Sequence, residues 1–279
     1  MAQFVHSRRH LVVITDLDGC LLSEKTHSCH AANAALSALR EIKATLVLAS
    51  AKTRRELESI TRLLRFDSPL IIENGGALLI PTGQCGSAVP NGQEIGEFVV
   101  VELGTPRSVL VSALTTLRLL LGAQLRSFSE MTPSELTTLT GLSEESANQA
   151  LCREFDEPFL LERLDELGPL RIAASDLGLR ISDGGKFLHL TGPTNKGKAL
   201  RLLLDQYKRE GLDFDSIGLG DSENDIEFLR VVDVPILIPR ADGQIHPVLK
   251  ATFPRAKRAS EPGPKGWNDA VLSALKHSS

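Results

Sequence analysis

Short apolar runs and amphipathic stretches alternate along the first part of the chain. Apolar residues recur every three or four positions over residues 30–43 and 53–65, which predicts two amphipathic helices. The apolar runs are too short for such helices, and they predict buried strands at residues 11–15, 44–49 and 70–72. This strand–helix order predicts a parallel sheet with right-handed crossovers.

The pattern changes after Pro81. Residues 82–96 are rich in Gly, Pro, Asn and Gln, which indicates a linker or a solvated hairpin. The residues that follow mix helical and antiparallel signals. They predict a strand at 98–103, a helix at 106–121, helix starts at Thr132 and Ser143, and a hairpin formed by 179–182 and 187–191.

The strand–helix order returns near Thr194. It predicts helices at 196–210 and 223–231, strands at 216–220 and 234–238, a surface loop at 254–266 and a final helix from Trp267. We therefore predict an α/β fold in which a doubly wound parallel-sheet core, residues 1–82 and 192–279, is interrupted by a second domain at 83–191.

Composition narrows the function. The chain has 279 residues, of which 31 are basic and 35 acidic, and the net charge of −4 argues against nucleic-acid or membrane partners. The 4% of aromatic residues argues against a stacking platform. No apolar run approaches the roughly 20 residues of a membrane span. Residues 1–10 lack a hydrophobic leader, and the four cysteines lack paired spacing, so we expect a cytoplasmic protein with reduced thiols.

Acidic residues follow two of the predicted strands. Asp16 and Asp18 end the first strand, and Asp221 and Asp225 follow the strand at 216–220. In parallel sheets the carboxyl ends of strands form the ligand site. A single acidic pair is explained equally well by turns and helix caps. Two such motifs, each after a buried strand, instead indicate repelling carboxylates that bind Mg²⁺.

These residues also carry a resemblance. DLDGC at 16–20, Ser50, Lys196 and GDSEND at 220–225 resemble the four motifs of haloacid-dehalogenase-like phosphatases. Further segments, spread over most of the chain, resemble the mannosyl-3-phosphoglycerate phosphatases. They are LASAKTRRE at 48–56, IIENGGA at 71–77, REFDEPFLL at 153–161, GGKFLHLTG at 184–192 and GPKGWNDAV at 263–271. The resemblance implies that the second domain is a cap of the C2B type.

The resemblance also implies a mechanism. Asp16 would be the nucleophile that forms an aspartyl-phosphate, and Asp18 the general acid and base. Mg²⁺ would be bound by Asp16, the Asp18 backbone carbonyl and Asp221, with Asp225 behind them. Ser50 and Lys196 would hold the phosphate. The implied reaction converts mannosyl-3-phosphoglycerate to mannosylglycerate, a compatible solute, and the alternative is a glucosyl-3-phosphoglycerate or another sugar phosphate.

The same resemblance suggests which residues bind the rest of this small-molecule substrate. Lys52, Arg153, Lys186 and His189 are candidates for the glycerate carboxylate, and Glu154, Asp156 and Thr191 for the sugar hydroxyls; Thr53, Asn74 and Asn224 are further candidates. Alternatively, residues 153–158 end a helix with solvated charges and His189 faces solvent. Three positions depart from the family pattern, where Cys20 replaces Thr, Ala51 replaces Ser and Lys186 replaces Arg.

Two other functions remain open at this stage. Residues 192–199 nearly match a phosphate-binding loop of the Walker A type, which would make the protein an NTPase. Ala199, however, stands where the loop needs a hydroxyl for Mg²⁺. A non-catalytic binding module with the same fold is disfavoured because the acids, Ser50 and Lys196 are all present. The oligomeric state is not predicted by the sequence.

Overall fold

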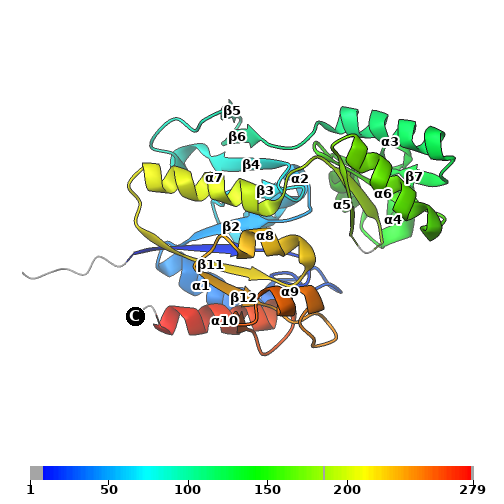
Figure 1. Cartoon of the computed structure of the whole chain (residues 1–279). Helices are drawn as coiled ribbons and strands as arrows, with labels where there is room; N and C mark the ends of the chain where they lie inside the picture. Colours follow the sequence, from blue (N-terminus) through cyan, green and yellow to red (C-terminus); the bar gives the residue numbers. More distant parts are fainter. Residues whose placement is uncertain (1–8, 185, 278–279) are drawn as a thin grey trace, which may run out of the picture.

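The structure is a computed structural model that describes residues 9–184 and 186–277. Most of the 1–10 segment, used above to expect no leader, and Gly185 in the predicted hairpin therefore lie outside the described residues. Within them the chain forms two sheets, each packed against its own helices (Figure 1). The α/β fold with an inserted second unit is confirmed.

The larger sheet has nine strands in the order β13-β12-β11-β1-β2-β3-β4-β6-β5. From β13 to β3 the neighbouring strands are parallel, and β4, β6 and β5 continue the sheet antiparallel. Every strand predicted for the parallel core is present. The strands are β1 (His10–Thr15), β2 (Thr45–Ala49), β3 (Leu70–Ile72), β4 (Ala77–Pro81), β5 (Gln93–Ile95), β6 (Phe98–Glu102), β11 (Phe214–Gly220), β12 (Val234–Leu237) and β13 (Lys257–Arg258).

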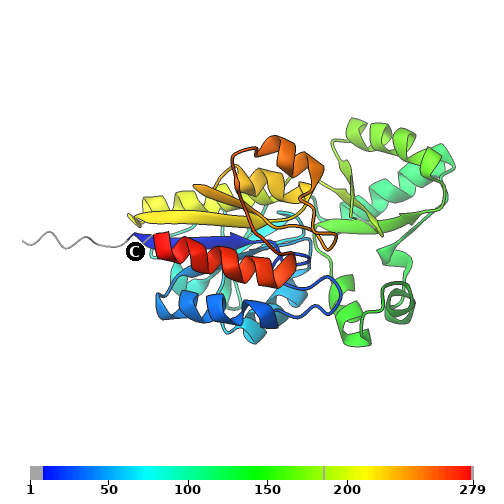
Figure 2. The same ribbon diagram turned by 90° about the horizontal axis from the view of Figure 1, so that it is seen from below.

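Apolar layers cover both faces of this sheet because successive residues of a strand point to opposite sides. On β1, Val13 packs in the layer of α1, α2 and α10, whereas Val12 and Ile14 pack in the layer of α7, α8 and α9. Figure 2 shows α1 and α10 side by side on one face. The helices are α1 (Asn33–Glu41), α2 (Arg54–Leu64), α7 (Lys196–Arg209), α8 (Ile226–Leu229), α9 (Pro247–Thr252) and α10 (Gly263–His277), with 3₁₀ turns at His30–Ala32, Thr82–Gln84 and Glu223–Asp225.

Two stretches differ from the sequence prediction. Residues 93–102, placed above in the inserted domain, form β5 and β6, and β6 pairs with β4 of the larger sheet. The composition of residues 82–96 indicates a linker or a hairpin, whereas β6 returns antiparallel to β4 across this segment and so stays in the larger sheet. The predicted surface loop at 254–266 is wrong in part, since it contains β13 and the first turn of α10. Lys257 and Arg258 pair with β12 at the edge of the sheet.

The smaller sheet is antiparallel, in the order β7-β8-β10-β9. The predicted hairpin is confirmed as β9 and β10, and Thr132 and Ser143 cap their helices as predicted. Leu114 of α3 and Leu170 of α6 pack in the apolar layer of this sheet. The elements are β7 (Leu125–Ser127), β8 (Asp156–Leu161), β9 (Arg180–Asp183), β10 (Leu188–Thr191), α3 (Arg107–Leu121), α4 (Pro133–Thr140), α5 (Glu144–Leu151) and α6 (Leu167–Asp176), with 3₁₀ turns at Phe128–Glu130 and Leu164–Glu166.

Two short linkers connect the units, and both contact the loop after β3. In the first linker, the backbone N–H groups of Leu103 and Gly104 donate to the carbonyl of Gly76 at 2.9 and 2.8 Å. In the second, the Thr194 hydroxyl donates to the carbonyl of Gly75 at 2.7 Å. The carboxyl ends of β1 and β11 point toward the second unit (Figure 1). The linkers therefore hold the second unit beside the carboxyl ends of β1 and β11, where we expect the site.

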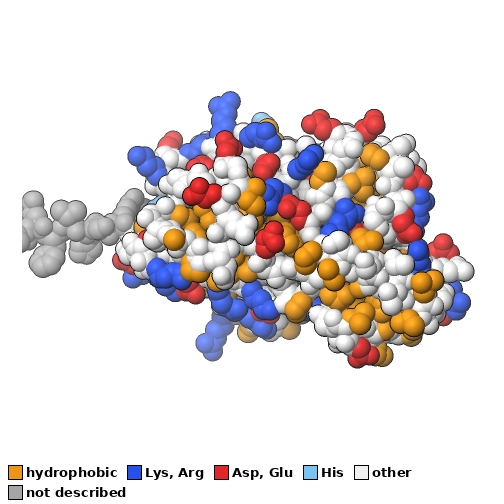
Figure 3. Space-filling model, turned by 90° about the horizontal axis from the view of Figure 1, so that it is seen from above, with side chains coloured by type: hydrophobic (Ala, Val, Ile, Leu, Met, Phe, Trp, Pro, Cys, Tyr) orange, Lys and Arg blue, Asp and Glu red, His pale blue; other side chains and the backbone are white. Residues whose placement is uncertain are grey.

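The second unit also carries exposed apolar side chains. Leu119, Leu120, Leu164 and Ile172 are between 68% and 77% exposed. Figure 3 shows hydrophobic side chains gathered on this part of the face that it draws. No helix within residues 9–184 and 186–277 is both long and apolar enough to cross a membrane.

Candidate active site

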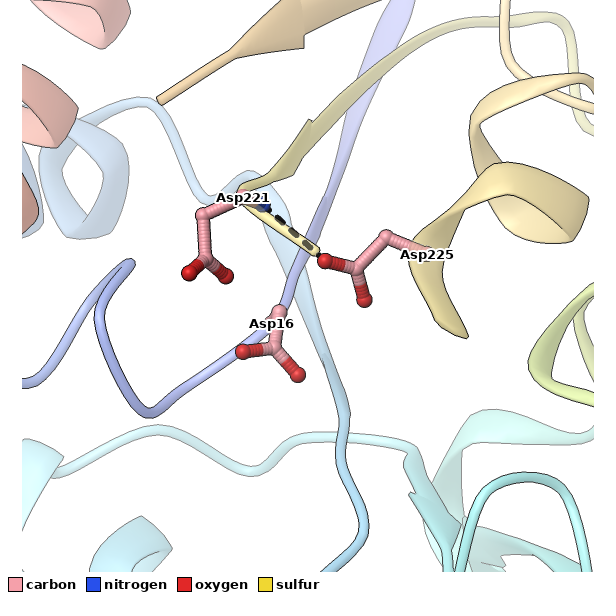
Figure 4. Close-up of side chains that lie close together, drawn as sticks. All are labelled: Asp16, Asp221 and Asp225. Atoms are coloured by element: carbon pink, nitrogen blue, oxygen red, sulfur yellow. Dashed lines mark hydrogen bonds between the residues drawn. The ribbon is translucent and has the colours of Figure 1, made fainter. Parts of the chain in front are cut away.

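Three buried carboxylates meet where β1 and β11 end (Figure 4). The two strands pair in parallel with Thr15 opposite Leu219, so Asp16 and Asp221 leave the sheet side by side. Asp225 approaches from the 3₁₀ turn that follows. One carboxylate oxygen of each residue lies within 4.8 Å of the others. The two acidic motifs of the sequence therefore form one cluster.

Lys196 brings a positive charge into this cluster. Its side chain is fully buried, and Nζ lies 2.5 Å from Oδ1 of Asp16 and 2.7 Å from Oδ1 of Asp225. Burial lowers the pKa of Lys196, but the two carboxylates outweigh burial and hold the pKa above its usual value. The other oxygen of Asp225 accepts the backbone N–H groups of Asp221 and Ser222, each at 3.0 Å. Asp225 thus holds Lys196 and the Asp221 turn, with both of its oxygens engaged.

One ammonium group does not balance the three carboxylates of the cluster. Burial raises the pKa of Asp16 to about 7 even though Lys196 opposes the shift. Burial, together with repulsion from Asp16, raises the pKa of Asp221 to about 9. Oδ1 of Asp221 is buried and accepts no hydrogen bond from the described residues. Hard oxygen donors that repel one another, one of them without a partner, fit a divalent cation such as Mg²⁺.

Asp18 lies on the turn after Asp16 and is more open. Its side chain is 42% exposed, and Oδ2 lies 2.7 Å from Nζ of Lys52. Gly19 makes the turn possible, because its φ of +78° favours glycine and a Cβ there would lie 2.8 Å from Oδ2 of Asp221. His27, which sequence reasoning missed, lies 3.6 Å from Asp18 through Nδ1.

The backbone of Asp16 is held by a chain of hydrogen bonds from α10. The indole N–H of Trp267 donates to the Thr15 hydroxyl at 2.9 Å, and that hydroxyl donates to the Asp16 carbonyl at 2.6 Å. Cys20 lies 3.6 Å from the same hydroxyl through Sγ, so its thiol keeps a weak contact there. Trp267 and Thr15 were not among the predicted site residues. The pairing spans 252 positions, and only the GPKGWNDAV match pointed to this region.

The residues after β2 lie beside Asp18. Ser50 is buried, and its Oγ accepts the backbone N–H of Lys52 at 3.3 Å. Thr53 is also buried and caps α2, with its hydroxyl donating to the carbonyl of Gln149 in the second unit at 2.9 Å. The structure therefore brings Ser50 and Lys52 to the site, whereas the Thr53 hydroxyl is used for capping and for contact between the units.

Three predicted substrate residues form a buried ionic network. Asp156 is fully buried, and its Oδ2 lies 2.9 Å from Nη1 of Arg153 and 2.7 Å from Nδ1 of His189. Residues 153–158 do not end a helix but lead into β8, and His189 does not face solvent. Glu154, also a candidate, pairs with Arg54 of α2 at 3.1 Å.

Glu73, in the loop after β3, is a further residue that sequence reasoning missed. It is buried at a φ of +46°, and its carboxylate accepts the backbone N–H groups of Glu154 and Phe155 at 2.9 and 2.8 Å. Burial raises its pKa to about 7. The sequence around Glu73 indicates only a turn before two glycines, so it did not predict this contact between the units.

The remaining candidates have no side-chain contact with the ionic network among the described residues. Asn224 donates through Nδ2 to Oδ1 of Asn74 at 3.1 Å, which links two loops beside the acidic cluster. Thr191 is buried at the end of β10, opposite Asp156. Lys186 is exposed, and its ammonium donates to the carbonyl of Leu139. The structure therefore does not place Lys186 with the acidic cluster.

The segment that imitates a Walker A loop has another use. It is the second linker and the start of α7, and it follows β10, an antiparallel strand of the smaller sheet. A Cβ on Gly197 would lie 2.2 Å from the carbonyl oxygen of Glu227, so this glycine allows α7 to pack closely on the turn of α8. The Lys198 ammonium donates to the carbonyl of Pro193. Lys196, not Lys198, enters the acidic cluster.

Comparison with known proteins agrees with this geometry. Residues 13–88 match a family model described as haloacid dehalogenase-like hydrolase. A curated relative from Methanococcoides burtonii, named glucosyl-3-phosphoglycerate/mannosyl-3-phosphoglycerate phosphatase, is 35% identical over 95% of this chain and 97% of its own length. A relative of the same name from Persephonella marina is 33% identical over the same shares.

Solved structures show the same fold. A haloacid dehalogenase-like hydrolase from Bacteroides thetaiotaomicron superposes with a TM-score of 0.66, covering 96% of this chain and 99% of the other, at 17% sequence identity. Since the superposition covers nearly all of both chains, the two-unit arrangement is shared and not confined to the larger sheet.

The raised pKa values of the cluster predict how stability depends on pH. The stability of the metal-free protein should fall as the pH rises from about 4 to about 9. Over this range Asp16 and Asp221 keep protons in the folded state that the unfolded chain has released. Mg²⁺ competes with those protons, so the rise in melting temperature on adding MgCl₂ should be larger at about pH 8.5 than at about pH 5.5, by about 5 °C. Differential scanning fluorimetry measures both. Asp221→Asn should remove most of the Mg²⁺ response, and an equal response in this variant would contradict the assignment.

The two lysines of the Walker-like segment should differ sharply. Lys196→Met should reduce phosphatase activity by at least about 10³-fold, because it leaves Asp16 and Asp225 buried without their cation. Lys198→Met, on the exposed side of the same helix turn, should stay within about twofold of the unmodified protein. Turnover of p-nitrophenyl phosphate by both variants measures this. The reverse ranking would favour a nucleotide-binding loop.

Proposed function

Since the chain belongs to the haloacid dehalogenase-like hydrolases, and within them to the glucosyl-3-phosphoglycerate/mannosyl-3-phosphoglycerate phosphatases, we propose that it removes the phosphate from mannosyl-3-phosphoglycerate. The observation that carries the proposal is the extent of the match, which covers 95% of the chain and therefore both units. The names of the two relatives favour glucosyl-3-phosphoglycerate as a second substrate. The expected partner is thus a small sugar phosphate.

In the proposed reaction Asp16 attacks the phosphorus atom through a carboxylate oxygen. The bond between phosphorus and the ester oxygen breaks, and Asp18 gives a proton to that oxygen, which leaves with the glycerate carbon as an alkoxide. Asp18 suits this role because its side chain is partly exposed and two residues from the nucleophile. A water molecule then loses a proton to Asp18 and attacks the aspartyl-phosphate, which releases inorganic phosphate and restores Asp16.

The cations of the site offset the negative charges of Asp16 and of the phosphate during these steps. Lys196 keeps Asp16 oriented through the 2.5 Å contact, and Ser50 and Lys196 are expected to bind phosphate oxygens. Mg²⁺, held by the carboxylates of Asp16 and Asp221 and the backbone carbonyl of Asp18, would offset the negative charge of the phosphate beside that of Asp16. Asp225 would support it by fixing Lys196 and the backbone of Asp221.

The contacts of the candidate residues favour some of them over others for binding the glycerate and the sugar. Arg153 and His189 are already paired with Asp156, and Lys186 is bonded to α4. Lys52 is the candidate cation that lies next to Asp18. We therefore propose Lys52 for the glycerate carboxylate, and Asn74 and Asn224, beside the cluster, for the hydroxyls.

Replacement of the nucleophile gives a direct test. Asp16→Asn should lower turnover by at least about 10³-fold, because an amide oxygen is a poor nucleophile toward phosphorus. Acid quenching after mixing with labelled substrate should trap protein-bound phosphate in the unmodified enzyme and none in the variant. Asp205→Asn, on the exposed side of α7, is the matched control and should keep full activity. Unchanged turnover in Asp16→Asn would contradict the mechanism.

The substrate is tested by side-by-side turnover. We expect kcat/KM for mannosyl-3-phosphoglycerate and glucosyl-3-phosphoglycerate to exceed that for free 3-phosphoglycerate by at least about tenfold, because the glycosyl group adds contacts that the free acid lacks. Steady-state release of inorganic phosphate measures all three. Preference for free 3-phosphoglycerate would overturn the glycoside assignment while leaving the phosphatase chemistry intact.

A further inference from the structure

The loop after β2 has three consecutive carbonyl groups, and each has a partner. The carbonyls of Ser50 and Lys52 accept the backbone N–H groups of Asn74 and Glu73, at 2.9 and 3.0 Å, from the loop after β3. The carbonyl between them, that of Ala51, accepts Nη1 of Arg153 at 2.7 Å. The middle contact therefore comes from a side chain that precedes β8 of the second unit.

The peptide bond held by Arg153 is the one that contacts Ser50. A peptide group is planar, so a hydrogen bond to the Ala51 carbonyl also fixes the direction of the Lys52 N–H. That N–H donates to Oγ of Ser50 at 3.3 Å. The same residue, Lys52, carries the ammonium that lies 2.7 Å from Asp18. One peptide group thus orients the hydroxyl expected to bind phosphate and the base of the side chain that contacts the general acid.

Arg153 is itself fixed in this position. Its side chain is only 8% exposed, Nε donates to the carbonyl of Ala150 at 3.2 Å, and the guanidinium lies 5.8 Å from the ring centre of Phe128. Burial opposes ionisation of Asp156, but His189 and Arg153 together hold its pKa below the usual value. Asp156 is therefore an ionised partner for Arg153. Because its Nε and Nη1 atoms are both engaged, the guanidinium is restrained from turning toward a substrate.

We propose that Arg153 is a positioning residue that fixes the Ser50–Lys52 phosphate-binding loop through the Ala51 carbonyl, and that it does not bind the glycerate carboxylate. Asp156 and His189 hold it there from β8 and β10. The inference rests on the proposed phosphatase function, but not on the identity of the sugar. In this proposal, the charged residues Arg153 and Asp156 of the REFDEP segment maintain the geometry of the phosphate site.

Two substrates separate the two roles of Arg153. Loss of a positioning contact weakens phosphate binding and turnover for every phosphomonoester, whereas loss of a carboxylate contact affects only substrates that carry the glycerate group. In Arg153→Met we expect kcat/KM to fall by about 10- to 100-fold for p-nitrophenyl phosphate and equally for the glycosyl-3-phosphoglycerate. The inhibition constant of inorganic phosphate should rise by a similar factor. Arg153→Lys, which supplies one charge without the fork, should fall between.

Arg107→Met is the matched control. Arg107 also belongs to the second unit and makes the same kinds of contact, with Glu157 at 2.6 Å and the carbonyl of Leu151 at 2.8 Å, but no contact with residues 50–53 is found among the described residues. It should lower the melting temperature as Arg153→Met does, while keeping kcat/KM for p-nitrophenyl phosphate within about twofold. Equal losses in both variants would overturn a specific role for Arg153.

The result that would refute the proposal most directly is selective loss. If Arg153→Met keeps full activity on p-nitrophenyl phosphate and loses it only on the glycosyl substrate, Arg153 binds the carboxylate. A wrong substrate assignment gives a different pattern. In that case the unmodified enzyme fails on both glycosyl-3-phosphoglycerates. Turnover of p-nitrophenyl phosphate by Arg153→Met, set against Arg107→Met, then still tests the positioning role of Arg153.

Discussion

A single buried ammonium group organises this site. Lys196 lies between Asp16 and Asp225, which come from opposite ends of the core sequence, and none of the three is more than slightly exposed. Charges at such depth persist only when they are paired with good geometry. The pairing requires β1, β11 and α7 to meet at one edge of the sheet, and α7 starts where the chain returns from the second unit. The point where the inserted unit ends therefore also fixes the position of the Lys196 ammonium group.

Polar contacts also join the two units to each other. The loops after β2 and β3 supply Thr53, Ala51 and Glu73, and each contacts residues between 149 and 155 of the second unit. These loops stand at the carboxyl ends of parallel strands, next to the acidic cluster. The loops beside the acidic cluster and the start of β8 are thus joined by one set of hydrogen bonds.

Much of this was predictable because it is local. Short apolar runs indicate buried parallel strands. Thr53, Thr132 and Ser143 indicate helix starts because their hydroxyls cap the helices that follow. The acidic cluster was predictable because parallel strands end at one edge. What sequence could not predict depends on partners distant in the chain. Glu73 is buried against the backbone of Glu154 and Phe155. Asp156 pairs with His189 of another strand, and Arg153 contacts the carbonyl of Ala51, so these side chains are all placed by tertiary contacts.

The hydrogen bond between Trp267 and Thr15 joins β1, the first strand of the described residues, to α10, the last helix among them. Synthesis on the ribosome proceeds from the N-terminus, so the strand that bears Asp16 exists long before its indole partner. Until α10 has emerged and docked, the Thr15 hydroxyl and the Asp16 carbonyl lack this restraint. A chain caught part-way through synthesis would thus carry the acidic residues without the geometry that makes them useful. The site is therefore completed only after α10 has been synthesised and has packed against β1.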